Sequence, residues 1–113
     1  MRHFYIIANY DKEYVLEAET FIRSYLEGKG AQCTVQPAFP QDCLNRHTGS
    51  AMVPPEVQCV ITIGGDGTLI QAARDLAGRD IPMVGVNRGH LGFLNQISRQ
   101  EDIAPVMDAL LGA

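Results

Sequence analysis

Short apolar runs and segments of helical periodicity alternate along this chain. The apolar runs span residues 4–8, 33–35, 58–63 and 82–86. Each run is too short for a stable helix, and the third is rich in β-branched side chains, so each predicts a buried strand.

Three further segments place their apolar residues on one helical face. They span residues 14–26, 69–76 and 103–111. Glycines that should end these helices follow each segment: Gly28 and Gly30, then Gly78, then Gly112. Thr68 with Gln71, and Ser98 with Glu101, have capping-box spacing, which predicts that the second helix begins at residue 68 and the third near residue 98.

Residues 37–56 break this alternation. They contain Pro37, Pro40, Pro54 and Pro55, with polar and small residues between them. A stretch of about 20 residues without periodicity is unusual inside a compact domain. Two interpretations stay open, namely a mobile functional loop or a short helix over residues 41–46 within a tether.

The resulting order is strand, helix, strand, loop, strand, helix, strand, loop, helix. It predicts an α/β fold, Rossmann-like, with a mostly parallel sheet and helices on both faces. Ligands of such sheets bind beyond the carboxyl ends of the strands. The glycine-rich loops, residues 64–68 and 87–94, follow predicted strands, so we expect them at one edge of the sheet.

Composition narrows the class of protein further. The chain has 113 residues, 46% of them hydrophobic, which fits one globular domain. The net charge of −4, without any run of Lys or Arg, argues against nucleic-acid and membrane partners. Cys33, Cys43 and Cys59 are odd in number and lack metal-ligand spacing, and the apolar run at the N-terminus is too short for a secretory signal. We therefore expect reduced thiols and a cytoplasmic location.

The segment Gly64-Gly65-Asp66-Gly67-Thr68 lies between a predicted strand and a predicted helix. Its glycines can adopt positive φ and allow a ligand to approach the backbone. The following helix offers unpaired N–H groups, so the segment suits phosphate. A carboxylate there would repel phosphate, unless it deprotonates a hydroxyl that attacks a phosphoryl group.

Each polar residue of this segment also has a structural interpretation. Asp66 is a candidate catalytic base, but Asp beside Gly is equally typical of a turn. Thr68 could bind a phosphate or only cap the helix. The residues alone leave both pairs of alternatives open.

The whole segment resembles the signature shared by NAD kinases, by diacylglycerol and sphingosine kinases and, more distantly, by phosphofructokinases. Residues 85–94, which read GVNRGHLGFL, are similar to the second conserved block of the NAD kinase family. Lipid kinases have a Gly-Thr-Gly-Asn-Asp block there instead. The resemblance covers nearly the whole chain.

The resemblance implies phosphoryl transfer from ATP, with a divalent metal ion such as Mg²⁺ that this chain does not ligate, to the adenosine-ribose 2′-hydroxyl of NAD. It implies that Asp66 is the general base. Gly64, Gly65 and Gly67 would form the phosphate- and ribose-binding turn, to which Thr68 belongs. The second block would contribute Asn87, Gly89 and Phe93, although Phe93 could also be a core aromatic. The family's basic residue one turn into the helix is in doubt, since Gln71 lies there.

The resemblance also implies a second, β-rich domain, which we expect to be absent from residues 1–113. This chain would then be the N-terminal nucleotide-binding domain, inactive alone, of a protein that forms homo-oligomers. Two alternative functions remain: a lipid or other small-molecule kinase of the same superfamily, and a catalytically silent nucleotide-binding module. A dehydrogenase is disfavoured, because no Gly-x-Gly-x-x-Gly follows the first strand.

Overall fold

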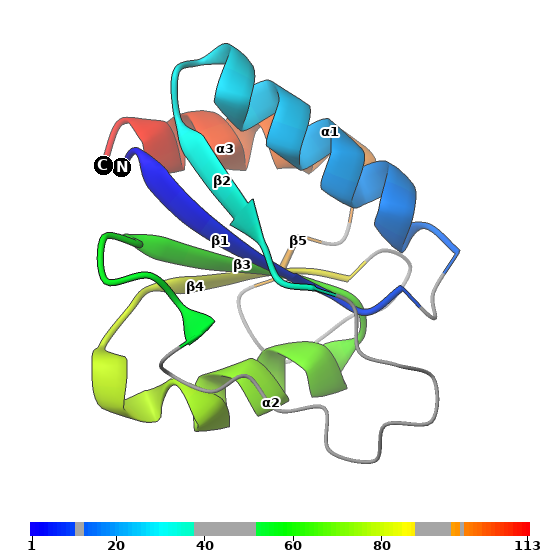
Figure 1. Cartoon of the computed structure of the whole chain (residues 1–113). Helices are drawn as coiled ribbons and strands as arrows, with labels where there is room; N and C mark the ends of the chain where they lie inside the picture. The colour runs from blue at the N-terminus through cyan, green and yellow to red at the C-terminus, as the bar shows by residue number, and fades with distance from the viewer. Residues whose placement is uncertain (11–12, 38–51, 88–95, 98) are drawn as a thin grey trace.

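The computed structural model describes residues 1–10, 13–37, 52–87, 96–97 and 99–113. Its centre is a sheet of parallel strands in the order β2-β1-β3-β4-β5 (Figure 1). The strands are β1 (His3–Ala8), β2 (Gln32–Val35), β3 (Cys59–Ile63), β4 (Met83–Val86) and β5 (Gln96–Ile97).

Helices cover both faces of the sheet. They are α1 (Val15–Gly28), α2 (Asp66–Asp75) and α3 (Ile103–Leu111), with short 3-10 turns η2 (Ala77–Arg79) and η3 (Gln100–Asp102). Figure 1 shows α1 and α3 on one face and α2 on the other. The expected α/β, Rossmann-like architecture is therefore confirmed. Within the described residues, no helix has the length and apolar character needed to span a bilayer.

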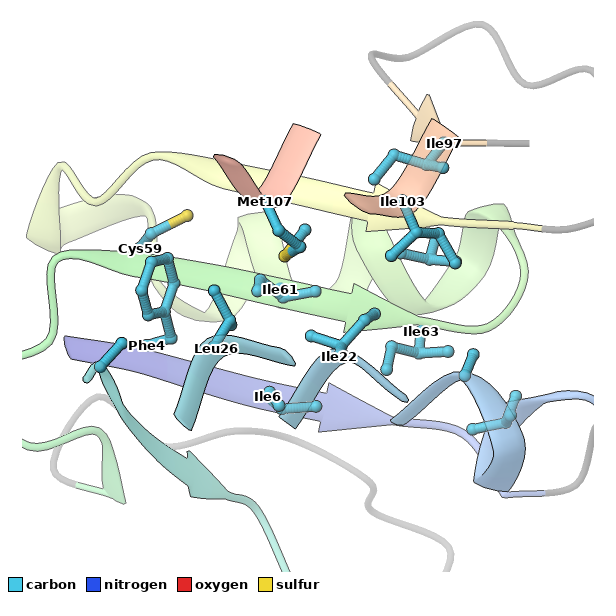
Figure 2. Packing of buried hydrophobic residues seen from close by; sticks show 14 residues of the cluster. Phe4, Ile6, Ile22, Leu26, Cys59, Ile61, Ile63, Ile97, Ile103 and Met107 are labelled. Atoms are coloured by element: carbon cyan, nitrogen blue, oxygen red, sulfur yellow. The ribbon is translucent and has the colours of Figure 1, made fainter. Parts of the chain in front are cut away.

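Alternation along the strands divides the core into two layers. Phe4 and Ile6 of β1 face α1 and α3, whereas Tyr5 and Ile7 face α2. Figure 2 shows the larger layer, where side chains of β1 and β3 meet those of α1 and α3. All of β3 is buried, as expected for a central parallel strand covered on both faces.

The path of the chain defines a switch point between β1 and β3. From β1 the chain passes through α1 to β2 on one side, and β3 then pairs with β1 on its other side. Ligands of open α/β sheets bind at the carboxyl edge beside such a point. The sequence did not predict β5, which adds to the sheet through only two residues, Gln96 opposite Gly85 and Ile97 opposite Val86.

Helix α1 ends at the predicted glycines. Gly28 is its last helical residue, and Gly30 adopts φ 87° just beyond the Lys29 cap. The Gly30 N–H donates to Glu27 O and the Ala31 N–H to Leu26 O, which is the Schellman arrangement. Gly30 ends the helix because this motif needs a left-handed residue.

The helix starts predicted from capping-box spacing are wrong. Helix α2 begins at Asp66 with Gly65 as N-cap, so Thr68 already lies in its first turn. Helix α3 begins at Ile103 with Asp102 as N-cap, after the 3-10 turn η3, and Ser98 lies outside the described residues. Neither described N-cap residue, Gly65 or Asp102, makes a side-chain cap hydrogen bond.

Most of the unusual segment, residues 38–51, lies outside the described part of the chain, as does the helix considered at 41–46. The end of the segment packs into the core layer between the sheet and α2. Val53 is buried there, and Arg79 donates to the carbonyls of Val53 and Pro54 at 2.6 and 3.2 Å.

Candidate functional site

The turn between β3 and α2, residues 64–68, lies at the carboxyl edge of the sheet. The Gly64 N–H donates to Val86 O at 2.9 Å, which extends the pairing of β3 with β4 by one residue. Gly64 has φ 156°, and the extended Gly65 (φ −83°, ψ 179°) then leads into α2. The turn therefore leaves the sheet abruptly and starts the helix within two residues.

The three glycines of this turn have different surroundings. A Cβ on Gly64 would lie 2.7 Å from Thr68 Oγ1 and 3.1 Å from Asn9 Cβ, so a side chain cannot fit there without displacing its neighbours. A Cβ on Gly65 or on Gly67 would meet no described atom within 4 Å. Gly64 is thus required for packing inside the domain, whereas Gly65 and Gly67 leave room for a ligand beside the backbone.

Thr68 is half-buried against Gly64, and its N–H donates to Gly65 O at 3.1 Å. This bond closes the first turn of α2. Of the two interpretations of Thr68, the helix cap is excluded because Gly65 is the cap, and a role toward a ligand stays a prediction.

The second glycine-rich loop begins beside the first. Asn87 follows β4, is buried, and donates its N–H to Ile97 O at 2.9 Å. Because β3 and β4 are neighbours, Gly64 and Asn87 leave the sheet at the same edge. Gly89 and Phe93 lie outside the described residues, as do Arg88 and His90.

Two residues that the sequence analysis did not select also lie at this turn. Asn9 follows β1, and its N–H donates to Ile63 O at 2.9 Å. The Tyr14 hydroxyl donates to Gly64 O, also at 2.9 Å. A polar residue directly after a strand could have indicated Asn9. No local signal indicates Tyr14, because its bond joins residues 50 positions apart.

This arrangement suits an anion. The N-cap Gly65 has no side chain to occupy the first N–H groups of α2. Those N–H groups and the helix dipole favour a phosphate at the end of the helix. Asp66 is the first residue of α2, and its side chain lies outside the described part of the chain. Among the described residues, no group of three His, Cys, Asp or Glu side chains could hold a metal ion.

The described thiols take no part in this site. Burial raises the pKa of Cys33 and of Cys59 from 9.0 to about 11. Both cysteines are free, and both are protonated at neutral pH, so neither is an activated nucleophile. Cys43 lies outside the described residues.

Comparison with known proteins agrees with this geometry. The family described as "ATP-NAD kinase N-terminal domain" matches residues 4–112. An NAD kinase from Lachnospira eligens is 44% identical over 98 residues, which cover 83% of this chain and 33% of the relative. An NAD kinase from Lachnoclostridium phytofermentans is 43% identical over 98 residues, covering 86% of this chain and 33% of the relative.

A third relative, from Methanococcus maripaludis, is named bifunctional NADP phosphatase/NAD kinase. It is 30% identical over 114 residues, which cover 98% of this chain and 20% of that protein. This chain therefore spans about a third or less of the length of these curated relatives.

Proposed function

Because the chain belongs to the ATP-NAD kinase N-terminal domain family, we propose that it is the nucleotide-binding domain of an enzyme that phosphorylates NAD. The reaction would move the γ-phosphoryl group of ATP to the adenosine-ribose 2′-hydroxyl of NAD, giving NADP and ADP. The observation that carries the proposal is the position of residues 64–68. They lie at the sheet switch point, and no described atom lies within 4 Å of a Cβ added at Gly65 or Gly67.

Asp66 is the proposed general base. Asp66 is the first residue of α2, where the helix N–H groups favour phosphate. The carboxylate would accept the 2′-hydroxyl proton while that oxygen attacks the γ-phosphorus, and ADP would leave. A carboxylate adjacent to an anion site lowers phosphate affinity, so its presence is better explained by catalysis than by binding.

The other predicted residues complete the proposed site. Gly65, Gly67 and Thr68 would contact phosphate or ribose, and Gly64 would shape the turn. Asn87, Gly89 and Phe93 would bind from the second loop. We propose that a divalent ion such as Mg²⁺ takes part in the transfer together with ATP.

The proposed catalytic unit is larger than this chain. We infer that a second, β-rich domain supplies the opposite wall of the nucleotide site and part of a homo-oligomer interface. Support comes from the relatives, of which this chain covers about a third or less. Residues 1–113 alone would then bind nucleotide weakly and would not turn over.

A substrate panel tests this function. The complete protein that contains this chain is incubated with ATP and, separately, NAD, a diacylglycerol or sphingosine, and NADP is detected with a coupled dehydrogenase. We expect NADP from NAD and no phosphorylated lipid. Lipid phosphorylation would support the alternative kinase, and nucleotide binding without any transfer would support the silent module. Either result overturns the proposal.

A further inference from the structure

A hydrogen bond joins the start of α1 to the glycine turn. Tyr14 is the N-cap residue of α1, and its hydroxyl donates to the main-chain oxygen of Gly64 at 2.9 Å in a partly buried position. The ring of Tyr14 also packs at the margin of the larger core layer, so its position is fixed by packing as well. The bond thus connects the loop after β1 to the turn after β3, across the switch point.

This bond determines the orientation of one peptide group. In a planar trans peptide, the C=O and the following N–H point in opposite directions. With Gly64 O held by Tyr14, the Gly65 N–H must point away from the Tyr14 hydroxyl. Gly65 is also the residue beside which a Cβ would meet no described atom within 4 Å. Because both observations concern Gly65, we expect its N–H to be accessible to a ligand.

The peptide needs such a restraint because glycines flank it on both sides. A peptide group between two glycines rotates with little steric resistance, since neither residue carries a Cβ. In the rotated orientation, Gly64 O would replace the Gly65 N–H and present a partial negative charge. A phosphate would then meet an acceptor where the productive turn offers a donor.

We propose that Tyr14 is a positioning residue for nucleotide binding, and that its hydroxyl holds the peptide between Gly64 and Gly65 in the orientation that donates to a phosphoryl oxygen. The inference rests on the proposed function and extends it to a residue outside both glycine-rich loops. Tyr14 acts through the turn and does not contact the nucleotide. The ligand chemistry is a nucleotide phosphate, which either ATP or the pyrophosphate of NAD can supply.

The test removes one hydroxyl and keeps the ring. Tyr14→Phe is compared with Tyr25→Phe in the complete protein. Tyr25 lies on the same helix, and its hydroxyl donates to Asp108 of α3 at 2.6 Å, remote from the turn. Since a net hydrogen bond corresponds to about a five- to tenfold change in an equilibrium constant, Tyr14→Phe should raise KM about five- to tenfold, with kcat within about twofold. Separate titrations of ATP and NAD show which phosphate lies at the turn. Tyr25→Phe should leave both KM values unchanged.

Hydrogen exchange of the turn gives a readout that needs no activity. Without nucleotide, the peptide spanning residues 64–68 should exchange faster in Tyr14→Phe than in wild type, and Tyr25→Phe should not change it. If the wild-type protein forms no NADP, the proposed function is refuted. The hydrogen exchange of residues 64–68 in the two variants would still test whether Tyr14 holds the turn. Equal KM values and equal exchange in the two variants, even with similar losses in Tm, would make Tyr14 merely structural and overturn the proposal.

Discussion

The two edges of the sheet are built differently. At the amino edge, side chains and chain ends bind backbone groups of the domain. Gln58 Oε1 accepts from the N–H groups of Arg2 and His3, and the Met1 amine donates to main-chain oxygens at the end of α3. At the carboxyl edge, the described residues pack against Gly64 of the turn at residues 64–68, but they do not fill the space beside Gly65 and Gly67.

This difference separates stability from binding. Polar groups that are satisfied within the domain at the amino edge stabilise the fold. The N-cap residue of α2 is Gly65, which has no side chain to cap the first N–H groups, so we expect these groups to bind a ligand. Substitutions at the amino edge should therefore lower the free energy of unfolding, and substitutions at the carboxyl edge should lower activity. The following predictions test that division.

The largest expected effect is at Asp66. In the complete protein, Asp66→Asn should lower kcat by about 10²–10⁴, because an amide cannot accept the 2′-hydroxyl proton. Nucleotide affinity and Tm should stay near wild type, since the amide has nearly the same size and removes a negative charge beside phosphate. Steady-state kinetics, nucleotide titration and thermal melting on both proteins check this. Retention of more than about a tenth of wild-type kcat would show that Asp66 is not the base.

Gly64 is expected to be the exception to the division, because it lies at the carboxyl edge yet is needed for packing. Gly64→Ala should lower the free energy of unfolding by about 1–3 kcal/mol, since the new Cβ overlaps Thr68 Oγ1 at 2.7 Å and φ is 156°. Urea denaturation measures this loss.

Gly67→Ala is the matched control. Its Cβ meets no described atom, so stability should be unchanged or should rise by up to about 1 kcal/mol from helix propensity. Its nucleotide affinity should fall roughly tenfold, about 1.4 kcal/mol, because the methyl group occupies ligand space. Equal stability of the two alanine variants would contradict the assignment of Gly64 to packing.

Arg79 tests the amino edge. Arg79→Ala removes two hydrogen bonds to the carbonyls of Val53 and Pro54, so the free energy of unfolding should fall by about 1–2 kcal/mol. The KM for NAD and ATP should not change. Arg99→Ala is the control, because the ion pairs of Arg99 with Glu101 and Asp102 are exposed and should contribute under about 1 kcal/mol. A rise in KM for Arg79→Ala, but not for Arg99→Ala, would show that the amino edge also affects nucleotide binding and would contradict the division.

The smallest effect at neutral pH concerns Cys33 and Cys59, which both pair in register with Phe4. Burial raises the pKa of each thiol from 9.0 to about 11. The folded state therefore holds these protons more tightly, and the stability they contribute is complete below pH 9 and is lost as pH rises through about 11. Urea denaturation between pH 8 and pH 10.5 should show a shallower decline for Cys33→Ala than for wild type. Identical slopes would mean that burial does not shift the thiol pKa.

The sequence predicted the strands β1 to β4 to within one residue at each end, but it misplaced the starts of two helices. Apolar periodicity identified every strand of the described sheet except β5, whose two residues are too few for a pattern. Capping-box spacing misplaced the starts of α2 and α3, because a four-residue pattern is common by chance and backbone turns can begin a helix without it. The sequence indicated that residues 64–68 form a turn after a strand, but it did not distinguish the glycine that packs inside the domain from the other two.

What the sequence determined by itself is therefore local: alternating hydrophobicity gives the α/β order, and residues 64–68 together with residues 85–94 identify the family. Tertiary structure alone decided which glycine is structural, because that depends on Thr68 and Asn9 meeting at Gly64. It also brought Tyr14 to Gly64 O, a contact between residues 50 positions apart. Local sequence patterns indicate which conformation a segment favours. The contacts at Gly64, in contrast, form only when parallel strands bring the ends of distant segments to the carboxyl edge of the sheet.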